Sequence, residues 1–140
     1  MKKRILIIDD EPHILLMLKK MLERSGYEID MAANGLEGIR LFRETSADLV
    51  ITDIIMPEKE GLETIREMRM IRDDLKIIAM SGGGKVSAEN YLDAAQIFGA
   101  ARMISKPFTK AEMVSAVREL LGDHEDKIGS SADEEVKEGL

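Results

Sequence analysis

The stretch Ile5-Leu6-Ile7-Ile8-Asp9-Asp10 decides the fold, because four consecutive aliphatic residues run directly into two aspartates. Three later stretches follow the same plan of an apolar run that ends on polar residues. They are Leu49-Val50-Ile51-Thr52 before Asp53, Ile77-Ile78-Ala79-Met80 before Ser81, and Met103-Ile104-Ser105 before Lys106-Pro107. Uninterrupted apolar strands are typical of parallel sheets that are covered on both faces. The carboxyl ends of parallel strands lie at one edge, so these polar residues are expected to meet there.

The segments between the apolar runs show the periodicity of helices. Apolar residues recur three and four positions apart from Pro12 to Ser25, and Pro12 suits the first helical turn while Gly26 suits the position after the end. The last helix is expected to begin with Thr109-x-x-Glu112, a capping box, and to bury apolar residues from Met113 to Leu121. Other helices are predicted at about Leu36–Thr45, Leu62–Arg72 and Ala88–Phe98, and strands at Tyr27–Ala32, Lys76–Met80 and Arg102–Ser105. Regular alternation of strand and helix predicts an α/β fold, a doubly wound parallel sheet of five strands with five helices.

Composition restricts the function classes. The chain has 140 residues, which is one domain's worth, and 44% hydrophobic with 34% charged residues fits a soluble globular protein. It has no cysteine, which excludes disulfides and thiolate metal sites and suits a cytoplasmic location. We find no signal peptide or membrane span. The net charge of -7 argues against nucleic acid as a partner.

The acidity is concentrated at the end of the chain. Residues 123–140 contain seven acids and two lysines but few large apolar side chains, so they cannot bury enough surface to order themselves. We therefore predict one domain over residues 1–122 and an acidic, disordered tail over residues 123–140.

The predicted sheet edge has the groups needed for phosphoryl chemistry. Asp9, Asp10 and Asp53 would repel one another there, and such a cluster takes up either a proton or a cation. Short acids that offer only oxygen ligands favour Mg²⁺, which keeps room for phosphate oxygens. Lys106 would supply a positive charge and Ser81 a hydroxyl donor. An aspartate carboxylate can itself be the nucleophile and form an aspartyl-phosphate.

These motifs together resemble the receiver domain of two-component response regulators, the CheY-like superfamily, over residues 3–122. The resemblance rests on the Asp9-Asp10 pair, the stretch Asp53-Ile-Ile-Met-Pro57 closed by Gly61, Ser81, and Lys106-Pro107-Phe108. The resemblance implies the flavodoxin-like strand order 2-1-3-4-5. Because the residues after Leu121 are not expected to form a helix-turn-helix, we predict a stand-alone receiver without a DNA-binding output domain. It also implies a phosphorylation switch rather than an enzyme with a free substrate.

The resemblance further implies a role for each site residue. Asp53 would accept a phosphoryl group from the phosphohistidine of a histidine kinase or phosphotransfer protein, or from acetyl phosphate. Asp10, Asp53 and the backbone carbonyl of Ile55 would bind Mg²⁺ directly, with Asp9 acting through water. The remaining implied features are phosphoryl contacts from Lys106 and Ser81, a cis peptide bond between Lys106 and Pro107, and a downstream protein partner that binds the last two helices and the fifth strand.

The chain departs from the family pattern at the positions that report and time the signal. Met103 stands where the family usually has an aromatic switch residue, so the signal is expected to depend more on Ser81 and the loop Gly82-Gly83-Gly84. Ile55 and Gly83 occupy two positions that tune hydrolysis of the aspartyl-phosphate in the family. Neither can orient a water molecule, which predicts a modest to long phosphoryl lifetime.

Three alternatives remain, and two of them have a specific sequence test. A Mg²⁺-dependent phosphohydrolase of the haloacid-dehalogenase type would have an acid two residues after the nucleophile, where this chain has Ile55. A flavin- or nucleotide-binding protein would need Gly, Ser or Thr after the first strand, where this chain has Asp-Asp-Glu-Pro. A receiver that is part of a hybrid kinase would share every motif described above.

Overall fold

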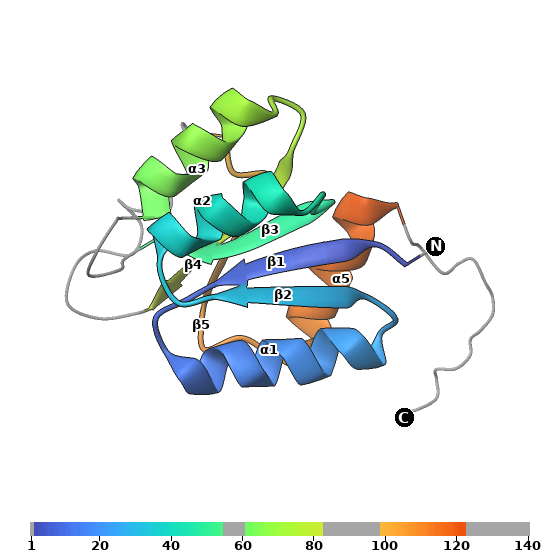
Figure 1. Cartoon of the computed structure of the whole chain (residues 1–140). Coiled ribbons are helices and arrows are strands. Elements are labelled where there is room, and N and C mark those ends of the chain that lie inside the picture. Colours follow the sequence, from blue (N-terminus) through green and yellow to red (C-terminus); the bar gives the residue numbers. More distant parts are fainter. Residues whose placement is uncertain (1, 55–60, 83–98, 123–140) are drawn as a thin grey trace.

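A computed structural model describes residues 2–54, 61–82 and 99–122 of the chain. Its centre is a parallel five-stranded sheet in the order β2-β1-β3-β4-β5, which confirms the predicted fold class and strand order (Figure 1). The strands are β1 (Arg4–Ile8), β2 (Glu28–Ala32), β3 (Leu49–Asp53), β4 (Lys76–Gly82) and β5 (Arg102–Lys106). The edge position predicted for the second strand is also confirmed.

The four helices of the described residues cover both faces of the sheet (Figure 1). They are α1 (Pro12–Arg24), α2 (Gly35–Glu44), α3 (Gly61–Ile71) and α5 (Lys110–Leu121). Four of the five predicted helices are therefore confirmed to within one or two residues. The helix predicted at residues 88–98 and the tail predicted at residues 123–140 lie outside the described residues.

Each face of the sheet has its own apolar core. The core under α2 and α3 contains Leu6, Ile8, Ile39, Phe42, Val50, Ile54, Ile65, Met68, Ile77 and Ala79. The core under α1 and α5 contains Ile5, Ile7, Leu15, Leu18, Leu22, Leu49, Ile51, Ile78, Met80, Met113 and Val117. Successive strand residues point to opposite faces, so burial on both sides explains the unbroken apolar runs.

The helix ends follow local rules that were visible in the sequence. Pro12 is in the first turn of α1, and Gly26, just after that helix, has a φ of 99°. Such a positive φ favours glycine because it has no Cβ. Thr109 and Glu112 form the predicted capping box, in which the Thr109 hydroxyl accepts from the Glu112 N–H and the Glu112 carboxylate accepts from the Thr109 N–H.

No helix in the described ranges is both long enough and apolar enough to cross a membrane.

Candidate phosphoryl-transfer site

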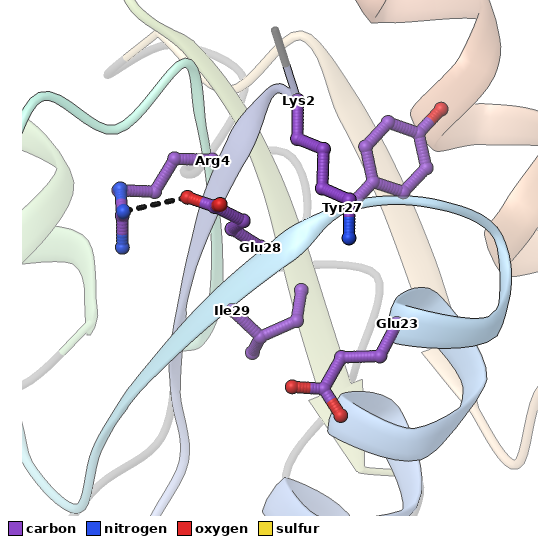
Figure 2. Close-up of a pocket in the computed structure, with 6 residues that line it drawn as sticks. All are labelled: Lys2, Arg4, Glu23, Tyr27, Glu28 and Ile29. Atoms are coloured by element: carbon purple, nitrogen blue, oxygen red, sulfur yellow. Dashed lines mark hydrogen bonds and ion pairs between the residues drawn. The ribbon is translucent and has the colours of Figure 1, made fainter.

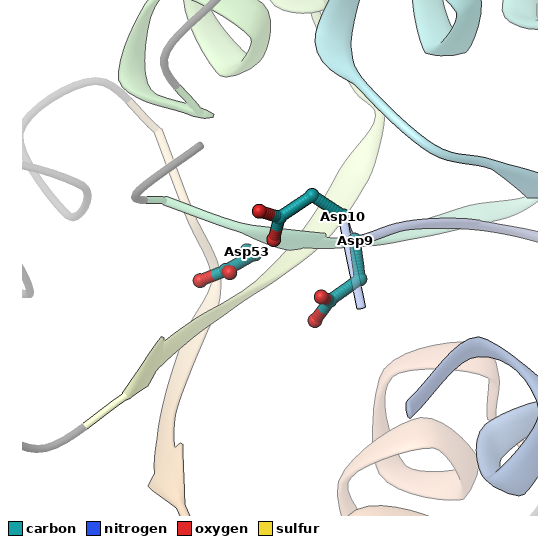
Figure 3. Close-up of side chains that lie close together, drawn as sticks. All are labelled: Asp9, Asp10 and Asp53. Atoms are coloured by element: carbon teal, nitrogen blue, oxygen red, sulfur yellow. The ribbon is translucent and has the colours of Figure 1, made fainter. Parts of the chain in front are cut away.

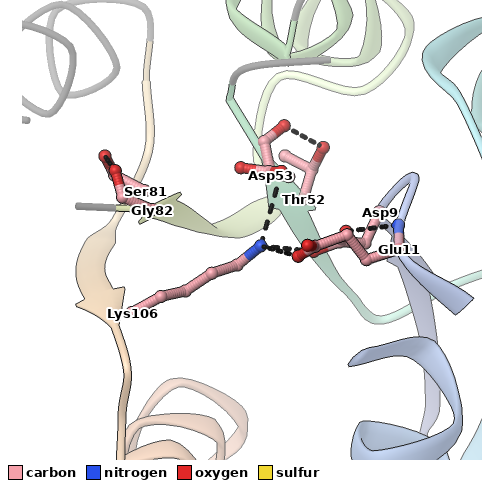
Figure 4. Close-up of polar contacts among 7 residues, drawn as sticks. All are labelled: Asp9, Glu11, Thr52, Asp53, Ser81, Gly82 and Lys106. Atoms are coloured by element: carbon pink, nitrogen blue, oxygen red, sulfur yellow. Dashed lines mark hydrogen bonds and ion pairs between the residues drawn. The ribbon is translucent and has the colours of Figure 1, made fainter. Parts of the chain in front are cut away.

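The polar residues that follow the strands meet at the carboxyl edge of the sheet, as the sequence predicts for parallel strands (Figure 4). Asp9 comes directly after β1, Asp53 is the last residue of β3, and Lys106 is the last residue of β5. Ser81 was expected to follow the fourth strand but lies within β4, because its pairing with Ser105 extends β4 to Gly82.

Three carboxylates form the centre of this edge (Figure 3). Asp9, Asp10 and Asp53 each offer an oxygen within 4.8 Å of the others. The Asp9 and Asp53 residues are 0% and 6% exposed, whereas Asp10 is exposed. The cluster is therefore anchored in the protein interior and open to solvent on the Asp10 side.

Lys106 is the cation that contacts these acids. Its Nζ donates to Asp9 Oδ2 at 2.8 Å and lies 3.4 Å from Asp53 Oδ2 and 3.5 Å from Glu11 Oε1 (Figure 4). The lysine side chain is 13% exposed, so water screens these contacts poorly. Lys106 was predicted to contact the phosphoryl group. Without that group, its ammonium contacts Asp9 and Asp53.

Asp9 is held at both oxygens. Its Oδ2 accepts from Lys106, and its Oδ1 accepts from the Glu11 N–H at 2.9 Å. The Asp9 N–H donates to the Ala32 carbonyl at 3.1 Å, so the residue is also tied to β2. The bonds from Lys106 and from the Glu11 N–H thus orient the Asp9 carboxylate, while the bond to Ala32 holds its backbone.

Glu11 lies between the first strand and the first helix and belongs to the site. α1 begins at Pro12, which makes Glu11 the N-cap residue, and its side chain caps no helix amide. Its carboxylate lies near Lys106 instead, because the strong positive charge of the ammonium is close and the helix dipole is the weaker attraction. Glu11 therefore adds a fourth negative charge to the edge.

Burial and the nearby acids change the pKa values of Asp9 and Lys106. Burial raises the pKa of the Asp9 carboxyl, against the opposing pull of Lys106 and the Glu11 N–H. Burial alone would lower the pKa of Lys106, but its hydrogen bond to Asp9 and the charges of Asp53 and Glu11 outweigh this and raise it. Asp9 thus holds its proton more tightly because it is buried, and Lys106 holds its proton more tightly because acids surround it.

The donor set fits a hard divalent cation. Asp9, Asp10 and Asp53 offer only carboxylate oxygens, which Mg²⁺ prefers over the nitrogen and sulfur ligands of zinc sites. The exposed position of Asp10 leaves room for the water molecules that Mg²⁺ retains.

The two predicted switch residues are placed differently. Ser81 is fully buried, and its hydroxyl donates weakly to the Gly82 carbonyl at 3.4 Å, away from Asp53 (Figure 4). Met103 is half-buried on β5 and packs against the core under α2 and α3. Ile55, Gly83 and Gly84, which carried the predictions on metal binding, phosphoryl lifetime and the loop, lie outside the described residues.

Two further residues lie at this edge: Thr52, which the sequence did not single out, and Gly61, which the sequence placed in the acceptor motif without a role. The Thr52 hydroxyl donates to the Asp53 carbonyl at 3.0 Å, and Gly61 lies against the backbone of Asp53 and Ile54. Thr52 had appeared only as the end of an apolar run.

The peptide bond between Lys106 and Pro107 is cis, as the sequence predicted.

Known proteins have a similar fold and a similar sequence. The family model of the response regulator receiver domain matches residues 5–118. The chain is 36% identical to the chemotaxis protein CheY of Thermotoga maritima over 121 residues, covering 86% of this chain and 98% of that relative. It is 34% identical to the response regulator MprA of Mycobacterium sp. (strain KMS) over 122 residues, covering 86% of this chain. The chain spans about half of that relative's length, 51%.

A solved structure extends the likeness to a metal complex. The response regulator protein TrrA from Thermotoga maritima, crystallised in complex with Mg²⁺ and BeF, has a TM-score of 0.75 and 39% identity. The match covers 84% of this chain and 98% of that one. Fold, motif order and sequence agree, and the chain therefore belongs to the response regulator receiver domains of two-component signalling, the CheY-like superfamily.

Proposed function

We propose that this chain is a phosphorylation-controlled binding module in which Asp53 accepts a phosphoryl group from the phosphohistidine of a histidine kinase or phosphotransfer protein. The observation that carries the proposal is the surroundings of Asp53. Its buried carboxylate lies 3.4 Å from the Lys106 ammonium and within 4.8 Å of oxygens from Asp9 and Asp10. A nucleophile, a cation and a metal-ligand set are thus present in one place.

The transfer is a displacement at phosphorus. A carboxylate oxygen of Asp53 attacks the phosphorus atom, and a P–O bond forms as the P–N bond to the donor imidazole breaks. The imidazole nitrogen keeps the electron pair of that bond and takes a proton. Mg²⁺, when bound, supplies positive charge that offsets repulsion between the carboxylates and the phosphoryl oxygens.

The residues of the chain orient and neutralise the reacting groups. Asp10, Asp53 and the Ile55 carbonyl would hold Mg²⁺ directly, while Asp9, already bonded to Lys106, would act through water. Lys106 would exchange its contact with Asp53 for a phosphoryl oxygen. The Ser81 hydroxyl would leave the Gly82 carbonyl, a long bond of 3.4 Å, and donate to the same group.

The output of the switch is binding to another protein. We propose that the partner contacts β5, α5 and the predicted helix at residues 88–98, with Ser81 and Met103 reporting the phosphoryl group to that face. Met103 packs on a core that Ala79 of β4 shares, and Ala79 is the residue of β4 paired with it. The proposal involves no nucleic acid, no membrane contact and no turnover of a free substrate, and it places the protein in the cytoplasm.

Intact-mass measurement tests the central step. The protein is incubated with acetyl phosphate and Mg²⁺, alongside Asp53→Asn, and also with a phosphorylated histidine kinase. We expect the wild-type chain to gain one phosphoryl mass and Asp53→Asn to gain none. No Asp53-dependent gain from any donor would overturn the proposal. Release of inorganic phosphate far in excess of the protein would instead favour the phosphohydrolase.

A further inference from the structure

The first residue of α3 touches the backbone that carries the acceptor. The Gly61 N–H donates to the Ile54 carbonyl at 3.2 Å. A Cβ built on Gly61 would lie 2.1 Å from the Asp53 carbonyl oxygen and 2.4 Å from the Ile54 Cα. Glycine is therefore needed here for space, since the positive φ angles of the described residues occur at other glycines.

We propose that Gly61 is a positioning residue for phosphoryl transfer. Its missing side chain lets α3 begin directly against the Asp53–Ile54 peptide, and this contact fixes the acceptor carboxylate relative to Asp10 and Lys106. The inference rests on the function proposed above for Asp53. It adds to the charged and hydroxyl-bearing residues of the site a glycine that acts only by leaving space.

The acceptor peptide has little freedom to move away from a side chain at position 61. On the sheet side, the Ile54 N–H donates to the Met80 carbonyl at 3.0 Å. The Asp53 carbonyl accepts from the Thr52 hydroxyl at 3.0 Å. A methyl group at Gly61 would have to shift either α3 or this peptide, because every atom in collision belongs to the backbone.

A displaced peptide would carry the Asp53 carboxylate with it. Reactions that depend on alignment are sensitive to displacements of about 1 Å. The metal ligands are also affected, because Mg²⁺ requires near-ideal geometry from its oxygens. Substitution of Gly61 is therefore expected to damage metal binding and phosphoryl transfer beyond its effect on folding.

Gly38 provides a matched control on the same face of the sheet. A Cβ on Gly38 would lie 2.4 Å from Ile8 Cδ1 and 2.9 Å from Ile8 Cγ1. Those atoms belong to a side chain that can change rotamer, whereas the atoms facing Gly61 are backbone. Gly38→Ala thus crowds a helix against the sheet without pressing on the acceptor peptide.

The test compares Gly61→Ala, Gly38→Ala and the wild-type chain. Mg²⁺ affinity is measured by calorimetry well below the unfolding temperature, and phosphorylation by acetyl phosphate is followed by intact mass at saturating Mg²⁺. Circular dichroism checks that each variant is folded. We expect Gly61→Ala to weaken Mg²⁺ binding about tenfold or more, as loss of an outer-shell contact does. It should also slow phosphorylation at saturating Mg²⁺, while Gly38→Ala leaves both unchanged.

The outcomes separate this inference from the proposed function. A folded Gly61→Ala variant with wild-type Mg²⁺ affinity and phosphorylation rate would overturn the positioning role, and so would equal losses in both variants. If Gly61→Ala does not fold, Thr52→Val decides, because it removes the hydroxyl from the Asp53 carbonyl without a collision. Weaker Mg²⁺ binding by Thr52→Val supports the inference, and unchanged binding contradicts it. Failure of the wild-type chain to gain phosphoryl mass would refute the proposed function alone.

Discussion

The two edges of the sheet use similar ions in different surroundings. At the amino edge, Arg4 pairs with Glu28 at 2.6 Å and Asp30 at 2.9 Å, and Figure 2 shows the first contact beside an open pocket. Arg102 likewise pairs with Glu119 of α5. Most of these side chains are 35% exposed or more. The pocket beside them is lined by two basic residues, Lys2 and Arg4, and by two acids, Glu23 and Glu28.

The carboxyl edge differs in burial and in charge balance. Asp9 is 0% exposed, the Lys106 side chain is 13% exposed, and three acids, Asp9, Glu11 and Asp53, lie within 3.5 Å of that ammonium. Exposed ion pairs contribute about 0–1 kcal/mol because water and salt screen them. Breaking a buried pair costs about 3–5 kcal/mol because one charge is left uncompensated. Burial therefore makes the difference: the exposed ion pairs at the amino edge stabilise the fold only weakly, whereas the buried ones at the carboxyl edge hold together a cluster of acids that needs a cation.

Lys106→Met should have the largest effect on stability. The variant keeps the length of the side chain but leaves Asp9 and Asp53 without their cation, so the free energy of unfolding is expected to fall by about 3 kcal/mol at pH 7.5 without divalent metal. Urea denaturation followed by circular dichroism measures it. Mg²⁺ should narrow the deficit because it replaces part of the lost charge. A fall in the free energy of unfolding of less than about 1 kcal/mol, as for an exposed ion pair, would show that the two edges do not differ in stabilisation.

Asp9→Asn should stabilise the metal-free protein. Because burial raises the folded pKa of Asp9 above the usual aspartate value, its contribution to stability is present below the unfolded pKa and is lost as the pH rises through the folded pKa. At pH 7.5 in EDTA the charged Asp9 therefore costs stability, and the asparagine is expected to raise the free energy of unfolding.

The pH dependence checks the sign of the Asp9 effect. The gain from Asp9→Asn should shrink as the pH is lowered toward 4, since the wild-type carboxyl then takes up its proton. Urea denaturation of both proteins at several pH values measures the difference. An asparagine variant less stable than the wild-type chain at pH 7.5 in EDTA would show that the bond to Lys106 outweighs burial.

Arg102→Met should have the smallest effect. The pair with Glu119 is exposed at both ends, so the free energy of unfolding should change by less than about 1 kcal/mol, and by even less at high salt. Mg²⁺ affinity and phosphorylation should remain at wild-type values, because the side chain contacts none of the three clustered aspartates. A change in Mg²⁺ affinity would mean that the two edges are coupled through β5.

Local patterns predicted the secondary structure well because they are set by nearby residues. The capping box at Thr109, the glycine after α1 and the apolar strand cores each depend on a few consecutive positions. The contact of Glu11 has the opposite origin. Its orientation depends on Lys106, which lies 95 positions away in the chain, and no local rule contains that contact.

The amino-acid sequence by itself determined the chemistry of the site: three short acids, a hydroxyl and a lysine, each placed after an apolar run. That much follows from residue type and from the rule that parallel strands end at one edge. The tertiary structure decided which of these groups touch. Lys106 donates to Asp9, which lies 97 positions away in the chain, and Gly61 lies directly against the backbone of Asp53 and Ile54. Both contacts depend on the register of the strands and the position of α3, which are set by packing throughout the sheet.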